Sequence, residues 1–119
     1  MEPTILAVDD DPAVTRLACA LLKREGFRTL EAASGTQALE LLKTHTPDLI
    51  LLDIIMPDTD GFEVCRAIRQ NPRTADIPIV MLSAVSEQVR DSTVRVDGYV
   101  AKPFNPADLV AKVKEFLTQ

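Results

Sequence analysis

The chain has 119 residues, 46% of them hydrophobic and 26% charged, which is typical of a globular protein and leads us to expect one domain over residues 1–119. Eighteen acidic against 13 basic residues give a formal net charge of −5, which opposes attraction to a phosphate backbone and argues against direct nucleic-acid binding. No apolar stretch approaches the roughly 20 residues that cross a bilayer, and the first residues lack the pattern of a secretory signal, so we expect a cytoplasmic protein with no membrane partner.

The N-terminal segment predicts a buried strand followed by a helix. Residues 5–8 form a continuous apolar run that stops at Asp9 and Asp10. Asp11, followed by a proline, is typical of a helix N-cap, and Gly26 is typical of a helix end. Between them, apolar residues recur on one helical face: Val14, Leu17, Ala18, Leu21 and Leu22.

A weaker strand and a second helix follow. Residues 28–33 have the pattern of a strand at the edge of a sheet. Ser34 and Gln37 form a capping box at the start of a helix that should end near residues 45–47. Its inward side chains are predicted to be Ala38, Leu41 and Leu42.

The middle of the chain predicts a third strand and a third helix. Residues 49–52 are apolar and stop at Asp53. After a turn-rich loop, Asp60 and Glu63 have the pattern of an N-cap and its capping partner, and the helix should stop at Asn71, which precedes a proline. Its predicted buried stripe is Val64, Cys65 and Ile68.

Two more strands end in the same way. Residues 79–82 stop at Ser83, and residues 98–101 stop at Lys102. Asn105, again followed by a proline, is expected to cap the last helix. The inward side of that helix is predicted to carry Leu109, Val110, Val113, Phe116 and Leu117.

Strands that alternate with helices predict a parallel sheet covered by helices on both faces, which is a three-layer α/β fold. In such a fold, ligands bind beyond the carboxyl ends of the strands, and those ends lie along one edge of the sheet. We therefore expect Asp9, Asp10, Asp53, Ser83 and Lys102 to meet there. Independent helix caps would have no reason to occupy the matching position after four different strands.

The expected cluster has a definite chemistry. Neighbouring carboxylates repel one another unless a cation offsets their charge, and oxygen ligands without nearby His or Cys favour a hard ion such as Mg²⁺. Mg²⁺ commonly joins one or two carboxylates to phosphate oxygens. Asp53, at the end of the middle strand, is the candidate nucleophile for a covalent acyl phosphate. Lys102 and Ser83 would stabilise the phosphoryl oxygens.

Each residue taken alone also has a structural explanation. Aspartates that follow a strand are common in turns and at helix N-caps, which could explain Asp9 and Asp10, and we interpret Asp11 as a cap only. Ser83 alone would be an ordinary turn hydroxyl, and Lys102 alone would be a solvated surface charge. The functional interpretation therefore depends on their convergence.

The two cysteines, Cys19 and Cys65, lie far apart in sequence within helical patterns and lack the spacing of metal ligands. We interpret both as reduced packing residues. The alternative, a redox sensor, has no other support in the sequence.

The segments ILAVDDDP, LILLDIIMPDTDG, MLSA and YVAKPF closely resemble the receiver domain of two-component response regulators, and the resemblance covers essentially the whole chain. It implies a flavodoxin-like fold with strand order 2-1-3-4-5. It also implies a phosphorylation-operated signalling switch in which Asp53 receives a phosphoryl group from a histidine kinase or a phosphotransfer protein. Such a switch catalyses only its own phosphorylation and dephosphorylation, and it acts on a downstream protein or domain.

The resemblance further implies how the site is built. Asp10 and Asp53 would bind Mg²⁺ directly, Asp9 would bind it through water, and Ile55 would contribute its backbone carbonyl. Lys102 would pair with the acceptor and its phosphoryl group.

The remaining implied roles concern the switch itself. Ser83 would hydrogen-bond a phosphoryl oxygen, and Tyr99 on the fifth strand would turn inward when Ser83 moves, which changes the output surface. The alternative for Tyr99 is an ordinary, partly buried strand aromatic. The bond between Lys102 and Pro103 is implied to be cis.

The sequence departs from this family in two places. Only 19 positions separate Ser83 from Lys102, about one helical turn fewer than we expect, so we predict a short or irregular fourth helix within residues 87–96 and doubt the usual dimer mode. Ile55 and Val85 are apolar where the family often carries polar residues that orient a hydrolytic water. We therefore predict slow self-dephosphorylation.

Other function classes fit less well. A metal-dependent phosphohydrolase with an aspartyl-phosphate intermediate would want a second acid two residues after Asp53, where Ile55 stands. A receiver-like module that is never phosphorylated would not need the combination of Asp10, Asp53, Ser83 and Lys102. A flavin carrier would need a phosphate-binding loop rich in Ser, Thr and Gly after the first strand, where an acidic run stands instead.

Overall fold

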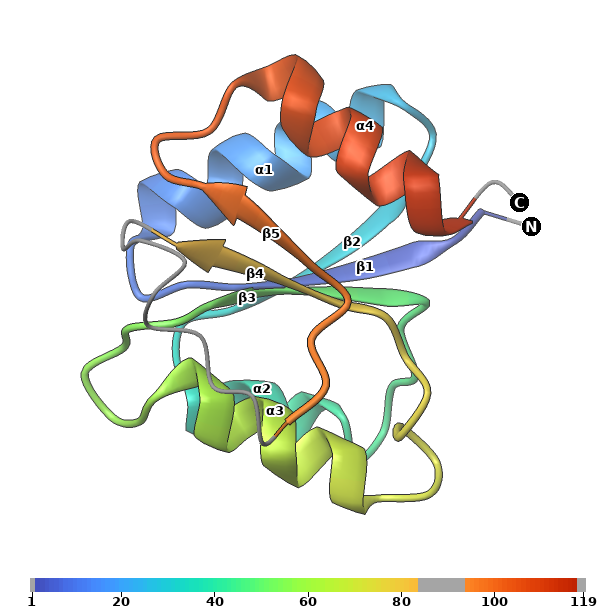
Figure 1. Ribbon diagram of the computed structural model, residues 1–119. Coiled ribbons are helices and arrows are strands. Elements are labelled where there is room, and N and C mark those ends of the chain that lie inside the picture. Colours follow the sequence, from blue (N-terminus) through green and yellow to red (C-terminus); the bar gives the residue numbers. More distant parts are fainter. Residues whose placement is uncertain (1, 84–93, 118–119) are drawn as a thin grey trace.

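The computed structural model describes residues 2–83 and 94–117 (Figure 1). In chain order the elements are β1 (Thr4–Val8), α1 (Pro12–Arg24), β2 (Arg28–Ala32), α2 (Gly35–Leu41), β3 (Leu49–Asp53), α3 (Gly61–Gln70), β4 (Ile79–Ser83), β5 (Gly98–Ala101) and α4 (Pro106–Leu117). Val85 and residues 87–93 of the expected short helix lie outside the described residues, and residues 94–96 are not helical.

The five strands form one sheet in the order β2-β1-β3-β4-β5, and every neighbouring pair is parallel. In Figure 1, α1 and α4 cover one face of this sheet, and α2 and α3 cover the other. The predicted three-layer α/β fold and its strand order are therefore confirmed. Because β3 lies in the middle, Asp53 at its end reaches the centre of the sheet's carboxyl edge.

Each face of the sheet has its own apolar core. Successive side chains of a strand point to opposite faces, so Ile50 of β3 packs with Phe62 and Ile68 of α3, whereas the next residue, Leu51, packs on the side of Leu22 of α1. Every residue of β3 and β4 is buried, which is typical of inner strands covered on both faces. No helix among the described residues combines the length and the apolar character needed to span a membrane.

The predicted caps fix where the helices begin. Asp11 accepts a hydrogen bond from the amide of Ala13 at the start of α1, and Asp60 accepts one from Phe62 at the start of α3. Ser34 caps α2 and Asn105 caps α4 in the same way. These bonds satisfy amides that have no partner inside their helix.

Three local expectations are wrong in detail. Gln37 does not complete the capping box at Ser34, because its side chain accepts from the amide of Ala33. Glu63 pairs with Arg66 at 2.7 Å, one turn along α3, instead of returning to its cap. The regular part of α2 ends at Leu41, before the expected residues 45–47.

Leu17 on α1 is also placed differently from the expectation, since it is 48% exposed. The buried stripe of α1 consists of Thr15, Ala18, Cys19 and Leu22, which follow the spacing of a single narrow face. The five apolar residues predicted to face inward are spread around more of the helix than this buried stripe, so the residues at the edges of the predicted face remain partly exposed to solvent. Cys19 and Cys65 are both buried and free, as predicted.

A polar network holds the start of β4 and β5 to α3. The guanidinium of Arg69 donates to the carboxylate of Asp97 at 2.8 Å and to the carbonyls of Ala75 and Ile77. Asp97 also accepts from the amide of Ile79 at 2.8 Å. Because both charged side chains are largely covered, this network fixes the approach of the chain to β5.

Candidate functional site

A pocket of about 290 Å³ lies at the carboxyl ends of the strands. In Figure 1 the arrowheads of β4 and β5 and the start of α1 all lie at the same edge of the sheet, where the strands end. The structure brings the acidic residues, the hydroxyl and the ammonium together in this pocket, although they come from four strands. It is lined by Asp9, Asp10, Asp11, Asp53, Ile54, Ile55, Ser83 and Lys102.

Lys102 connects two of the carboxylates. Its Nζ lies 2.7 Å from Oδ2 of Asp9 and 3.3 Å from Oδ1 of Asp53. The backbone amide of Lys102 donates to the carbonyl of Ser83 at 2.8 Å, which continues the ladder between β4 and β5 past their last pair. The ammonium is thus closer to Asp9 than to Asp53, the partner that the family resemblance implies.

Burial and charge change the protonation of the central residues. Loss of water around the carboxylate, and then the nearby charge of Asp9, raise the pKa of Asp53 from 3.8 to about 6, although Lys102 opposes this. Burial alone would lower the pKa of Lys102, but its hydrogen bond to Asp9 and the charge of Asp53 outweigh burial and raise it. Lys102 is therefore cationic at neutral pH, and Asp53 is mostly ionised there although it binds a proton more readily than an exposed carboxyl.

The donor set fits a hard divalent cation. Carboxylate oxygens of Asp9, Asp10 and Asp53 all lie within 4.8 Å of one another. Both oxygens of Asp9 already accept hydrogen bonds, one from the amide of Asp11 and one from Lys102. The side chain of Asp10 is exposed at the mouth of the pocket. An all-oxygen set with high negative charge suits Mg²⁺ and leaves Asp10 and Asp53 as the oxygens best able to bind it.

The loop after β3 brings backbone atoms to the pocket. The amide of Ile55 faces Oδ1 of Asp53 at 3.4 Å, and the side chain of Ile55 is 64% exposed. The loop closes where the amide of Gly61 donates to the carbonyl of Ile54 at 2.6 Å. A Cβ atom at Gly61 would lie 2.3 Å from the carbonyl oxygen of Asp53, so this approach requires glycine.

Ser83 and Tyr99 lie at different depths relative to the pocket. Ser83 is buried and lines it, whereas Tyr99 lies outside the lining, pairs with Met81 in the sheet, and packs at the margin of the core beside α2 and α3. Met81 and Ser83 are two positions apart on β4 and so point to the same face. Tyr99 and Ser83 therefore share the α3 side of the sheet.

Sequence reasoning missed an apolar groove that adjoins the pocket. This groove, of about 210 Å³, is lined by Ala13, Val14, Leu17, Lys102, Pro103 and Phe104. The bond between Lys102 and Pro103 is cis, as the resemblance implied. The signal in the sequence was the excess of apolar positions on α1, which we assigned to the core.

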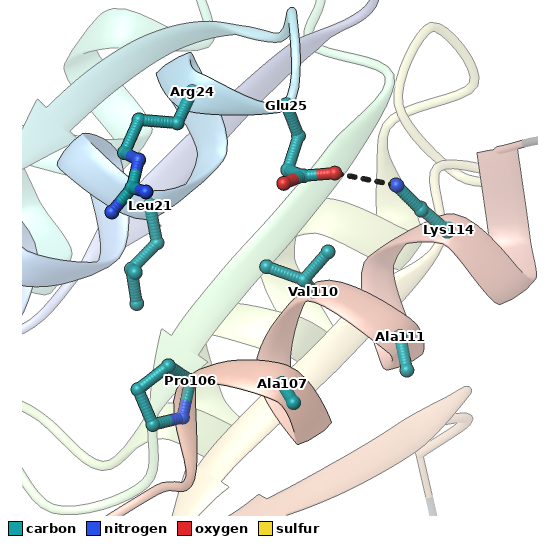
Figure 2. Close-up of a pocket in the computed structure, with 8 residues that line it drawn as sticks. All are labelled: Leu21, Arg24, Glu25, Pro106, Ala107, Val110, Ala111 and Lys114. Atoms are coloured by element: carbon teal, nitrogen blue, oxygen red, sulfur yellow. Dashed lines mark hydrogen bonds and ion pairs between the residues drawn. The ribbon is translucent and has the colours of Figure 1, made fainter.

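A second cavity, of about 450 Å³, lies between α1 and α4 (Figure 2). Leu21 and Val110 stand on opposite sides of it, and an ion pair of 2.5 Å between Glu25 and Lys114 crosses one end. Its lining lacks the clustered carboxylates and the buried hydroxyl of the acidic pocket. The acidic pocket is therefore the candidate functional site.

Comparisons with known proteins agree with this choice. Residues 5–114 match the family model described as the response regulator receiver domain. The DNA-binding dual master transcriptional regulator RpaA of Synechocystis sp. is 37% identical over 118 residues, which cover 97% of this chain and 49% of RpaA. The chain spans about half the length of the curated relatives it matches.

Solved structures give the same picture. The chemotaxis response regulator CheY4 of Vibrio cholerae superposes with a TM-score of 0.92 at 28% identity, over 98% of this chain and 99% of its own. The receiver domain of the sensor histidine kinase PA1611 of Pseudomonas aeruginosa superposes with a TM-score of 0.90 at 29% identity, over 100% of both chains. That structure has a magnesium ion coordinated in its active-site cleft.

Proposed function

The chain belongs to the response regulator receiver domains, which are phosphorylation-operated signalling switches, and we propose that Asp53 is its phosphoacceptor. The observation that carries this assignment is the position of Asp53, which is buried at the end of the central strand beside one ammonium and two other carboxylates. A carboxylate in this position can act as a nucleophile toward phosphorus. We further propose that residues 1–119 act as one receiver unit.

The proposed reaction is a direct transfer of a phosphoryl group. One oxygen of the ionised Asp53 attacks the phosphorus atom of the donor, the bond from phosphorus to the leaving nitrogen or oxygen breaks, and its electron pair stays with the leaving group. The product is an acyl phosphate on Asp53. The signal ends by hydrolysis: water attacks the same phosphorus atom, the bond from phosphorus to the oxygen of Asp53 breaks, and the products are the free carboxylate and inorganic phosphate.

The other residues of the pocket have separate proposed roles in this reaction. Lys102 lies within ion-pair distance of Asp53, so its ammonium can form an ion pair with the phosphoryl oxygens during and after the transfer. Asp10 and Asp53 would hold Mg²⁺ directly, Asp9 would hold it through water, and Ile55 would offer its backbone carbonyl. When bound, the ion neutralises the carboxylates and the phosphoryl oxygens.

We propose that Ser83 and Tyr99 convert this chemistry into a change of surface. The hydroxyl of Ser83 lines the pocket and can donate to a phosphoryl oxygen, while Tyr99 lies on the same side of the sheet on the neighbouring strand. A shift of Ser83 toward the phosphoryl group would open space beside Met81 for the tyrosine ring. Phosphorylation would thus change the population of two packings of β5.

The proposed phosphodonor is a histidine kinase or a phosphotransfer protein. The exposed Leu17 and the apolar groove next to Lys102 offer such a protein a contact surface beside the acceptor. The output partner would be a downstream protein or domain. The net charge of −5 speaks against direct contact of this chain with DNA, even though RpaA is a DNA-binding regulator. Two buried free thiols suit a reducing compartment, and we propose the cytoplasm.

Acetyl phosphate and Mg²⁺ provide the direct test. Intact-mass spectrometry should show the gain of one phosphoryl group in the wild type and in Asp76→Asn, a control whose side chain is 98% exposed. The gain should be absent in Asp53→Asn and in excess EDTA. A gain that persists in Asp53→Asn would contradict the assignment of the acceptor.

The same reaction separates two alternatives. Rapid release of phosphate from varied phosphate esters would favour a metal-dependent phosphohydrolase over a switch without metabolic turnover. A folded wild type that gains no phosphoryl group, even with a phosphorylated histidine kinase as donor, would favour a receiver-like interaction module.

A further inference from the structure

The loop between β3 and α3 is tied to a helix that takes no other part in the site. Asp58, near the tip of this loop, accepts three hydrogen bonds from the first residues of α2. The amide of Gly35 lies 3.3 Å from Oδ1 of Asp58, and the amide and hydroxyl of Thr36 lie 3.0 and 2.9 Å from Oδ2. The residues involved are more than 20 positions apart in sequence, so this is a tertiary contact.

The tether completes the capping of α2. The amide of Gln37 is satisfied locally by Ser34 at 3.0 Å, but the amides of Gly35 and Thr36 have no acceptor within the helix. Asp58 supplies the oxygens for both. These hydrogen bonds favour the ionised form and lower the pKa of Asp58, so its carboxylate is charged throughout the neutral range.

Steric fit holds the same two segments in contact. A Cβ atom at Gly35 would lie 2.3 Å from a methyl group of Thr59 and 2.7 Å from one of Val64, so the loop and α3 press directly on the backbone of α2. Nearer to β3, Ile54 and Met56 are buried in the same core cluster as Val64. Ile55, which lines the pocket between these two residues, is therefore followed by a loop that is held at its tip by the contact with α2.

We propose that Asp58 is a positioning residue for the phosphorylation site: by tying the loop to α2, it holds the backbone of Ile55 where its carbonyl can bind Mg²⁺. This inference rests on the proposed function, because it concerns the metal that phosphorylation of Asp53 requires. Asp58 itself does not line the pocket and acts only through the loop. Removing the tether lets the loop relax away from the pocket, so one of the ligands is lost for part of the time.

The test measures how much Mg²⁺ the full 119-residue chain needs. The variants are Asp58→Ala, which removes all three acceptor contacts, and Thr36→Val, which removes only the hydroxyl contact at nearly constant shape. Asp76→Ala is the matched control, because it removes the same charge from a side chain that is 98% exposed on another loop. Initial rates of phosphorylation by acetyl phosphate are measured against Mg²⁺ concentration.

The half-saturating Mg²⁺ concentration should rise at least about fivefold in Asp58→Ala, which is below the roughly 10–100-fold effects of groups that contact a metal ligand directly, because Asp58 acts through the loop. It should rise less in Thr36→Val and stay within about twofold of the wild type in Asp76→Ala. The rate at saturating Mg²⁺ should change by less than about twofold in all three, because the nucleophile and Lys102 are unaltered. A purely structural role would lower the melting temperature without moving the half-saturating concentration, and that result would overturn the proposal.

A titration with Mg²⁺ alone, followed by the backbone amide resonances, separates this inference from the proposed function. If the wild type binds Mg²⁺ but accepts no phosphoryl group, the proposed function fails, and the ratio of Mg²⁺ affinities still decides the role of Asp58. If Asp58→Ala does not fold, Asp58→Asn replaces it, since it keeps one acceptor oxygen. Equal Mg²⁺ affinity in Asp58→Asn, Thr36→Val and the wild type would then refute the tether.

Discussion

Replacing Asp53, the proposed phosphoacceptor, should stabilise the fold at neutral pH. Asp53→Asn keeps the size of the side chain and an acceptor oxygen for the amide of Ile55, but it removes a charge that is almost fully buried. Burial and the charge of Asp9 raise the pKa of Asp53 to about 6 from 3.8. The ionised carboxylate therefore opposes folding.

The size of the effect follows from proton linkage. The native state binds the Asp53 proton more tightly than the unfolded chain, so the free energy of unfolding falls as pH rises between about 3.8 and about 6. Below this range the carboxyl is protonated in both states and costs nothing. Above it, the difference between 3.8 and about 6, at about 1.36 kcal/mol for each pKa unit, amounts to about 3 kcal/mol.

Urea unfolding followed by far-UV circular dichroism at pH 4, 5, 6 and 7.5 measures this difference. We expect Asp53→Asn to exceed the wild type by about 3 kcal/mol at pH 7.5 and by less than about 1 kcal/mol at pH 4. Asp76→Asn, which loses an exposed charge, should follow the wild type at every pH. An Asp53→Asn variant that is no more stable than the wild type at pH 7.5, or an advantage that does not shrink with acid, would refute this reasoning.

Three further changes test other parts of the structure. Lys102→Ala should cost about 3 kcal/mol of stability at pH 7.5, because it leaves buried carboxylates without their cation, and much of this loss should return at pH 4.5 as Asp53 becomes protonated; a loss independent of pH would argue against the ion pairs. Arg69→Met should lower the urea midpoint by an amount that corresponds to about 2 kcal/mol, because the largely covered carboxylate of Asp97 loses its closest cation and keeps the more distant Arg95 at 4.0 Å. Arg66→Met, with a more exposed ion pair, should change it by less than about 1 kcal/mol. Phosphorylated Ile55→Asn should have a shorter half-life than the phosphorylated wild type, because a polar side chain at this exposed position can orient a hydrolytic water. A wild-type half-life of seconds in Mg²⁺ would contradict the predicted slow self-dephosphorylation.

The strands and their ends could be predicted because a buried parallel strand has a simple pattern in the sequence, an apolar run that stops at a polar residue. Once the alternation of strands and helices had indicated a parallel sheet, the meeting of Asp9, Asp53, Ser83 and Lys102 followed from topology alone. The caps at Asp11, Ser34, Asp60 and Asn105 were equally local and equally visible.

Contacts set by the packing of distant segments could not be predicted in this way. That Lys102 lies closer to Asp9 than to Asp53 depends on how the ends of three different strands are placed relative to one another, which no single segment of sequence determines. The tether from Asp58 to α2 likewise joins a loop and a helix whose sequences each look complete alone. Leu17 was misplaced because periodicity gives the face of a helix but not the width that its neighbours cover.

Lys102 contributes to two cavities, the acidic pocket through its ammonium and the apolar groove beside Leu17. A protein donor seated on the groove would press on the same side chain that balances the charge around Asp53, whereas a small donor such as acetyl phosphate would enter the pocket without that contact. Substitutions in the groove should therefore discriminate between donors, and the ratio of the two phosphorylation rates would distinguish recognition of the donor from the chemistry of transfer. Engineering the preference for the proposed protein donor would begin at that shared lysine's neighbours, with the lysine itself left in place.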